Sequence, residues 1–89
     1  LVLQTCPTER GGVELAVGFT ASRKVGNAIT RNRARRRLRA AVEKVMPLHA
    51  ALGFDYVVIA RASTVGRPFD ALIRDLENAL KRMDVWRVE

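Results

Sequence analysis

The sequence predicts one small α+β domain spanning residues 1–89, a two-layer sandwich of two helices on a small sheet with the element order β-β-α-β-α. Three observations predict this class. Apolar residues alternate with small or polar residues over 13–21, they run unbroken over 56–60, and they recur at helical spacing in two longer stretches. With 89 residues, 48% of them hydrophobic, the chain can build one core but is too short for a two-domain enzyme.

Two strands are expected before the first helix. Residues 1–6 form a short apolar segment that Pro7 ends, and the glycines within 8–12 favour a turn. The alternation over 13–21 predicts a second strand with one apolar face, and we expect these two strands to pair as an antiparallel hairpin. A third strand, the central one, is expected at 54–61 beside the second strand.

The first helix follows residues 24–27, and Asn27 or Thr30 can cap it. At 100° per residue, one stripe of this helix is apolar and the opposite side is polar, with Arg35 and Arg37 flanking the stripe. We expect Pro47 to end the helix. The apolar stripe comprises Ala34, Leu38, Ala41, Val42 and Val45, and the polar side comprises Asn32, Arg33, Arg36, Arg39 and Glu43.

The last helix is expected to begin near Pro68, a residue suited to a first helical turn. Its charged residues mix both signs, which is typical of a solvated surface. Its apolar residues keep helical spacing: Phe69, Leu72, Ile73, Leu76, Leu80 and Met83.

The positive charge of the chain is confined to one segment. The net charge is +7, yet residues 15–42 alone carry eight basic and no acidic residues, while the remainder carries eight basic and nine acidic ones. Six of the nine residues in 31–39 are arginine. A dense cationic segment on an otherwise balanced domain indicates a surface that binds a polyanion, and a nucleic acid is the first candidate.

The arginines also violate two rules of helix stability. Like charges four residues apart, such as Arg31 with Arg35, destabilise a helix by ~0.2–0.5 kcal/mol per pair. Basic residues near a helix N-terminus oppose the macrodipole. Such local conflicts are expected at functional sites, and the planar guanidinium fork suits bidentate contact with phosphate or with a guanine edge. Asn32 can read a base edge or hold an arginine in place.

The sequence shows no set of residues typical of a catalytic or metal site in this chain. His49, the only histidine, is expected in an exposed linker after the first helix, and Asp75 and Glu77 are expected to face different directions on the last helix. The lone Cys6 fits a reducing, cytoplasmic compartment. No apolar stretch is long enough to suggest a membrane span.

Residues 23–39, which run from Arg-Lys-Val-Gly-Asn-Ala into Arg-Asn-Arg-Ala-Arg-Arg-Arg, closely resemble the signature of the bacterial ribonuclease P protein component, and residues 53–61 resemble that family's strand after the helix. The resemblance implies a fold like that of the second domain of ribosomal protein S5, with a left-handed βαβ crossover. It also implies an RNA-binding and tRNA-binding subunit of a ribonucleoprotein endonuclease, a hydrolase of tRNA processing. In this family the catalytic RNA uses Mg²⁺ to remove the 5′ leader of precursor tRNA, and the protein is a cofactor with no catalytic residue or metal of its own.

Carried over residue by residue, the resemblance implies two RNA sites. The catalytic RNA would contact Arg23, Lys24, Asn27, Arg31, Asn32, Arg33, Arg35, Arg36, Arg37 and Arg39. The leader would lie on small residues of the second strand and its end: Ala16, Gly18, Thr20 and Ser22. Phe19 could stack a base there, although its place in the apolar alternation favours a core role. The family's N-terminal helix would lie before Leu1, so we expect an N-terminally truncated domain whose uncovered apolar surface promotes self-association.

Two alternatives come from other functional classes. A generic basic-helix protein of the ribosomal type, binding RNA or DNA with no role in tRNA processing, would share the arginines but would not explain the Lys-Val-Gly-Asn-Ala segment. A stand-alone nuclease would need carboxylates or histidines on the basic face, where Glu43 is the only candidate.

Overall fold

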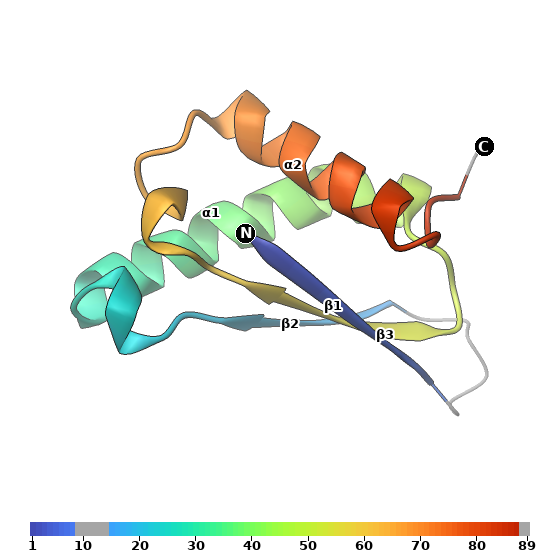
Figure 1. The fold of residues 1–89 in the computed structure, drawn as a ribbon, viewed down its shortest axis with the longest axis horizontal. Helices are drawn as coiled ribbons and strands as arrows, with labels where there is room; N and C mark the ends of the chain where they lie inside the picture. Colours follow the sequence, from blue (N-terminus) through green and yellow to red (C-terminus); the bar gives the residue numbers. More distant parts are fainter. Residues whose placement is uncertain (9–14, 88–89) are drawn as a thin grey trace.

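The computed structural model describes residues 1–8 and 15–87. It confirms the α+β class and the expected element order (Figure 1). Two short 3-10 helices, η1 and η2, accompany the regular elements. In chain order the elements are β1 (Val2–Pro7), β2 (Ala16–Thr20), η1 (Arg23–Val25), α1 (Ala28–His49), β3 (Phe54–Ile59), η2 (Ala62–Thr64) and α2 (Phe69–Arg82).

The sheet has the strand order β1-β3-β2, with β3 in the centre. β1 pairs with β3 in antiparallel orientation, and β2 pairs with β3 in parallel orientation. The predicted hairpin between the first two strands is therefore wrong, whereas the expected pairing of the second and third strands is confirmed. The central place suits β3 because its unbroken apolar run is buried best between two neighbours.

The chain passes from β2 through α1 to β3, a crossover between parallel strands, as the resemblance implied. The handedness of this crossover stays a prediction. The turn predicted within 8–12 falls almost wholly outside the described residues, and so do the first two residues of the strand predicted at 13–21.

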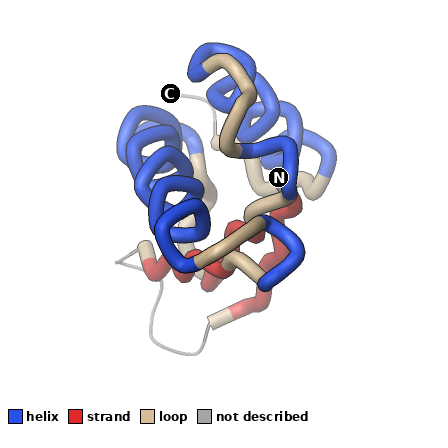
Figure 2. The backbone as a smooth tube through the Cα atoms, turned by 90° about the vertical axis from the view of Figure 1, so that its left-hand side faces the viewer, coloured by secondary structure: helices blue, strands red, loops and turns tan. Residues whose placement is uncertain are grey.

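Both helices cover the same face of the sheet (Figures 1 and 2). Leu3, Tyr56 and Val58 are buried on this covered face, where Leu3 and Val58 are cross-strand partners. Residues that alternate with them, including Gly18 and Thr20, are exposed on the opposite face. The domain therefore has one covered sheet face and one open sheet face.

The expected apolar stripe of α1 is buried, and so is Met46 one turn further on. The prediction that Pro47 ends the helix is wrong, since α1 continues to His49 and the amide of Ala50 donates to the Met46 carbonyl at 3.0 Å. Pro47 lacks the amide that would bond to the Glu43 carbonyl. Because Glu43 is exposed, water can replace this donor and the helix tolerates the proline.

α2 follows Pro68, which occupies the N-cap position. Leu72, Leu76 and Leu80 are completely buried, as its spacing predicts. Met83 lies just beyond the end of the helix and is 39% exposed, so the buried stripe ends at Leu80.

The C-terminal segment packs against the end of α1. The ring of Trp86 stacks on His49, with centroids 4.1 Å apart and an interplanar angle of 6°. The amide of Ala51 donates to the Val85 carbonyl at 2.8 Å. His49 is thus the half-buried last residue of α1 and not the exposed linker residue predicted from sequence, because the contact with Trp86 spans 37 positions that no local pattern reveals.

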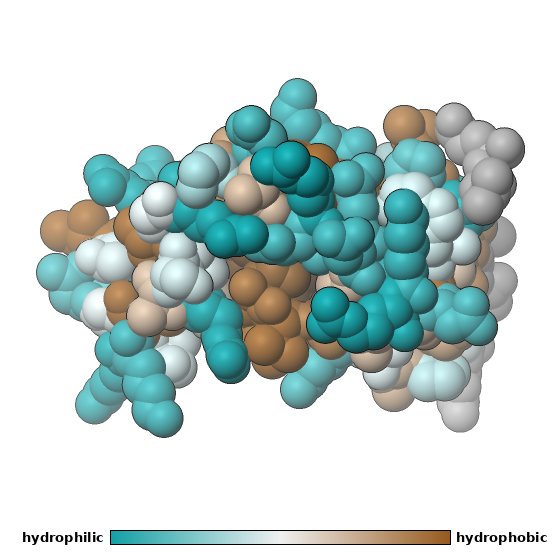
Figure 3. Space-filling view, turned by 45° about the horizontal axis from the view of Figure 1, so that its top comes forward, coloured by the Kyte–Doolittle hydropathy of each residue, from teal (hydrophilic) through white to brown (hydrophobic). Residues whose placement is uncertain are grey.

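The surface over the helices is mostly hydrophilic, with an apolar patch in its middle (Figure 3). A hollow of about 270 Å³ between the start of β1 and the end of α2 is lined by Leu1, Val2, Leu3, Ala79, Arg82 and Met83. Across the described ranges, neither helix combines the length and hydropathy that a membrane crossing requires.

Candidate nucleic-acid interface

The start of α1 is fixed by two residues. Asn27 is the N-cap, and its Oδ1 accepts a hydrogen bond from the Thr30 amide at 2.9 Å. Gly26 has a φ of +148°, and a Cβ there would lie 2.9 Å from Cγ2 of Thr30. Glycine is therefore required at this position, and of the two predicted caps the structure selects Asn27.

The polar side of α1 is exposed as predicted. Asn32, Arg33, Arg36 and Arg39 lie at the surface, because the alternate side of the helix carries the buried Ala34 and Leu38. Arg31, Arg35 and Arg37 are half-buried, which agrees with the flanking positions expected for two of them. We call Arg33, Arg36 and Arg39 the arginine face.

Asn32 holds an arginine in place. The Oδ1 atom of Asn32 accepts a hydrogen bond from Nη1 of Arg35 at 2.8 Å. This is one of the two roles that the sequence left open for Asn32. The bond limits the rotamers of Arg35, so less side-chain entropy would be lost when its guanidinium binds an anion.

Arg37 lies one turn after Arg33, and its guanidinium is bonded to the loop before α2. Its Nη1 donates to the Val65 carbonyl at 3.0 Å, and its Nη2 donates to the Arg67 carbonyl. These bonds fasten the loop before α2 to the middle of α1. The sequence placed Arg37 among the RNA contacts, whereas the structure uses its guanidinium to hold backbone carbonyls.

The two fastened elements border an open hollow of about 590 Å³, which we call the α1–α2 hollow. α1 contributes three arginines and one alanine, and the loop and first residue of α2 contribute one arginine with small or apolar residues. The lining residues are Arg33, Arg36, Arg37, Ala40, Gly66, Arg67, Pro68 and Phe69. Sequence reasoning missed the last four, because only the fold brings the loop onto α1.

A second hollow of about 420 Å³ lies further toward the N-terminus of α1. It is lined by Ile29, Asn32, Arg35, Arg36 and Arg39. Ile29 is 76% exposed, which is unusual for a large apolar residue on a small domain. The sequence did contain a signal for it, since Ile29 lies seven residues before Arg36 and so on the same helix side.

The open sheet face carries most of the residues predicted to bind a leader. Gly18 and Thr20 are exposed there, beside Val57 and Ile59 of β3. A Cβ at Gly18 would approach only the Tyr56 carbonyl oxygen, at 4.0 Å, so packing does not require glycine. Its absence of a side chain instead leaves room for another backbone to approach.

Ser22 and Phe19 lie elsewhere. Ser22 caps η1, with its Oγ accepting from the Lys24 amide at 3.3 Å. Phe19 is half-buried against the core on the covered face, and the guanidinium carbon of Arg39 lies 5.4 Å from its ring centroid. The core role favoured for Phe19 is therefore confirmed, and the ring also supports one member of the arginine face.

A third hollow, of about 280 Å³, lies where the parallel strands β2 and β3 end. Lys24 from η1 and Arg61 after β3 both line it, together with Ser22. This basic site connects the edge of the open sheet face to the start of α1. The sequence did not indicate Arg61, because 36 residues separate it from Val25, which lines the same hollow.

Comparison with known proteins shows which proteins this chain is similar to. The family model for ribonuclease P matches residues 1–84. The ribonuclease P protein component of Paramagnetospirillum magneticum is 55% identical over 86 residues, covering 93% of this chain and 65% of that protein. The corresponding protein of Ruegeria pomeroyi is 48% identical, covering 93% and 68%. The chain thus spans about two thirds of the length of these relatives.

The fold agrees with that of a solved relative. The RNase P protein of Staphylococcus aureus superposes with a TM-score of 0.75 at 28% identity, covering 96% of this chain and 75% of the other. A second structure of that protein, a mutant described as defective in mRNA degradation activity, also gives a TM-score of 0.75. On the family match, the sequence identity and the shared fold, the chain belongs to the ribonuclease P protein family.

Proposed function

We propose that the chain is the RNA-binding cofactor of a ribonuclease P, a ribonucleoprotein endonuclease that removes the 5′ leader of precursor tRNA in the cytoplasm. The arginine face carries this proposal. Its guanidinium groups are exposed on a helix that is capped by Asn27 and packed along its opposite side. A cationic surface held on a rigid element suits an RNA backbone, whose phosphates bind arginine with salt-dependent affinity.

The RNA-contacting set that we propose keeps the ten residues expected from the resemblance, with Arg37 acting through the loop that it fastens. Arg33, Arg36 and Arg39 contact phosphates directly, and Asn32 positions Arg35 beside them. Lys24 extends the positive surface from the start of α1 toward the ends of β2 and β3, and the exposed Arg23 precedes it in η1. Asn27 contributes mainly through the cap that fixes the helix.

We propose the open sheet face as the surface for the single-stranded leader. Gly18 and Thr20 form a shallow strip on β2 that a nucleotide backbone can approach closely. The basic hollow of Lys24 and Arg61 at the end of this strip supplies a contact for a leader phosphate. The leader and the catalytic RNA thus bind two adjoining surfaces that meet at η1.

The chemistry in this proposal belongs to the RNA, which supplies the Mg²⁺ sites. Within residues 1–8 and 15–87, no group of three or more His, Cys, Asp or Glu side chains comes together in a way that could hold a metal ion. Following the family resemblance, our proposal includes no magnesium ligand and no catalytic residue in this chain. Its contribution is to position the RNA and the leader and to offset the repulsion between their phosphates.

The test is cleavage of precursor tRNA by a bacterial ribonuclease P RNA at low Mg²⁺, with and without the full-length protein that contains this chain. We expect cleavage at the mature 5′ end that depends on the protein. Tight, salt-sensitive binding without stimulation would favour the basic-helix protein of the ribosomal type, and so would stronger binding to duplex DNA than to ribonuclease P RNA. Cleavage by the protein with no RNA subunit would contradict the cofactor role and favour a nuclease.

A further inference from the structure

We propose that the α1–α2 hollow binds one unpaired nucleotide of the partner RNA, with its base against Phe69 and Pro68 and its phosphate against Arg33 and Arg36. The inference rests on the proposed RNA-binding function and adds to it a site for a base. The arginine face by itself offers contacts to a backbone, whereas this hollow also offers a surface for an aromatic ring.

The hollow has the composition of a nucleotide site. At about 590 Å³ it lies within the roughly 300–1,000 Å³ range of ligand pockets. Its lining combines the apolar Ala40, Pro68 and Phe69 with arginines from both α1 and the loop. Apolar floors with a few convergent polar groups are typical of sites that bind small ring systems.

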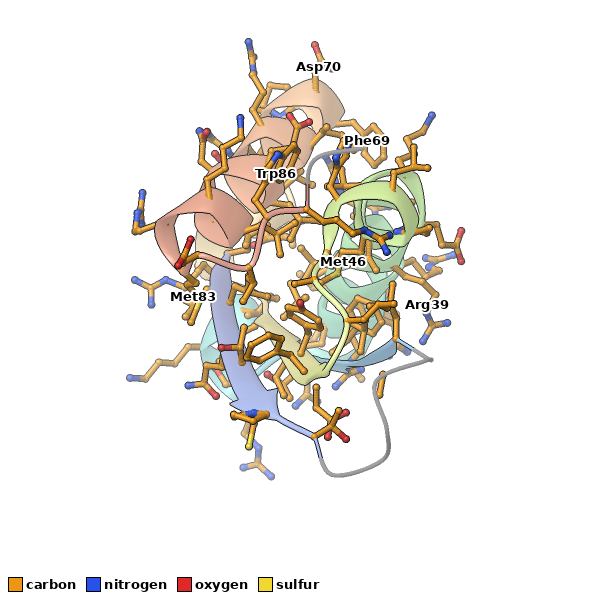
Figure 4. All side chains as sticks on the ribbon, turned by 90° about the vertical axis from the view of Figure 1, so that its right-hand side faces the viewer. Arg39, Met46, Phe69, Asp70, Met83 and Trp86 are labelled. Carbon is orange, nitrogen blue, oxygen red and sulfur yellow. The ribbon has the colours of Figure 1, made fainter. Side chains whose placement is uncertain are left out.

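Phe69 supplies the stacking surface. It is the first residue of α2 and is only half-buried, so part of its ring remains accessible. Figure 4 shows Phe69 on the side of α2 that faces α1, whereas the next residue, Asp70, points away from α1. A base can stack on such a ring whatever its sequence, because every base has a π-face.

The phosphate has several donors. Arg33 and Arg36 are exposed on the arginine face and also line the hollow. Arg67 pairs with Asp75 through Nε at 2.5 Å and Nη2 at 3.0 Å. This pair does not use Nη1 of Arg67, but it neutralises part of the charge of the guanidinium. Pro68 caps α2 without a side-chain hydrogen bond, so the first-turn amides of a 14-residue helix also favour an anion nearby.

The walls of the hollow are held in place before any ligand binds. Arg37 joins α1 to the carbonyls of Val65 and Arg67, and the Arg67–Asp75 pair joins the same loop to α2. A site fixed in this way loses little conformational entropy on binding. RNA is the occupant that fits best, because the hollow is continuous with the arginine face through Arg33 and Arg36.

Gly66 allows the hollow to be filled without removing a charge. It lines the hollow, and a Cβ at this position meets nothing within 4 Å. The series Gly66→Ala, Gly66→Val and Gly66→Leu therefore adds volume in steps. A second variant, Phe69→Leu, removes the ring but keeps an apolar side chain. Asn78→Leu is the control, since Asn78 is exposed on α2 and lies outside the lining.

The first measurement is the affinity of each full-length variant for a ribonuclease P RNA over a range of salt. We expect Gly66→Leu and Phe69→Leu to weaken binding roughly 5- to 100-fold, the range for loss of one base stack, with an unchanged salt slope. Asn78→Leu should bind nearly as the native protein does, and Gly66→Ala and Gly66→Val should fall in order between it and Gly66→Leu. Thermal unfolding of each variant checks that the fold is intact.

Full affinity of Gly66→Leu and Phe69→Leu, alongside weak binding of Arg33→Ala and Arg36→Ala, would overturn the nucleotide site and leave the proposed function standing. Full affinity of the arginine variants as well would contradict both the nucleotide site and the proposed function.

The second measurement is the NMR shift of the Phe69 ring protons. Oligoadenylate should move them upfield by ring current while inorganic polyphosphate does not, and equal shifts with both probes would overturn the base contact.

Discussion

At the scale of single residues, the structure explains the residue types just before α1 without any contact to RNA. Gly26 is required by its positive φ and by its contact with Thr30, and Asn27 is required by the cap. A pattern such as Lys-Val-Gly-Asn-Ala can thus identify a family because of how the chain turns into a helix. The arginines that follow depend on this turn for their direction.

Gly26→Ala should destabilise the domain by about 1–3 kcal/mol, because alanine must adopt a strained φ and its Cβ collides with Thr30. Gly66→Ala is the matched control, since its Cβ enters open space. Urea unfolding followed by circular dichroism measures both. Equal stability of the two variants would show that Gly26 is not under conformational constraint.

Tyr56 is the buried residue whose ionisation should affect stability. Burial raises the pKa of its hydroxyl above the usual value near 10, and the hydroxyl donates to the Ala51 carbonyl at 2.5 Å. The neutral form therefore stabilises the fold fully below pH ~10, and this contribution is lost as pH rises through the raised pKa. The free energy of unfolding, measured at neutral and at alkaline pH, reports this loss of stability.

Tyr56→Phe should cost about 1 kcal/mol at neutral pH, because the hydrogen bond to Ala51 is lost. The variant should also lose less stability than the native protein between about pH 9 and 11. Other groups titrate in this range in both proteins, so the difference between them isolates Tyr56. Identical alkaline losses would contradict this assignment.

At the scale of elements, α1 combines a buried stripe with the arginine face, and the charges on that face should control RNA affinity. If about six phosphates are neutralised, log K should fall with log salt with a slope of about −4 to −5.5. Replacing Arg33 and Arg36 by alanine should flatten this slope by about two units.

The control for this pair of substitutions is Arg74→Ala with Arg82→Ala, two exposed arginines on α2. These remove the same charge from a face of mixed sign, so the slope should change little. A slope that responds equally to both pairs would mean that binding depends on net charge and not on the arginine face.

β2 should tolerate a side chain at Gly18 for stability but not for leader binding. Since a Cβ there meets only the Tyr56 carbonyl oxygen at 4.0 Å, Gly18→Val should leave stability unchanged or raise it slightly. We expect weaker binding of precursor tRNA with a leader and unchanged binding of tRNA without one. Competition between these two RNAs measures the difference, and equal effects on both would contradict the leader surface.

The sequence predicted what local patterns encode and missed what distant segments create. Helical spacing identified the stripe of α1, and alternation placed Phe19 toward the core. The strand pairing could not be predicted from the sequence, because an apolar strand can pair with the first strand or with the third. Likewise no local signal joined Arg37 to a loop 30 residues away, so the α1–α2 hollow emerged only from the fold.

At the scale of the whole molecule, the apolar hollow between β1 and α2 favours self-association. β1 is an edge strand, and Met83 beside it is 39% exposed. An apolar surface next to a free strand edge can pair with a second copy. Light scattering should give a mass above that of the monomer that rises with concentration, and Met83→Glu should reduce it. A constant monomer mass at high concentration would contradict this prediction.

The place of β3 in the sheet also determines when this domain can fold during synthesis. Within residues 1–8 and 15–87, β1 and β2 pair in the sheet with β3 alone, which leaves the ribosome after both of them and after α1. α1 likewise lacks α2, the element that it contacts most, until the last part of the chain has emerged. The cationic sequence of α1 therefore emerges before any part of the sheet can form, so it cannot yet pack on the sheet.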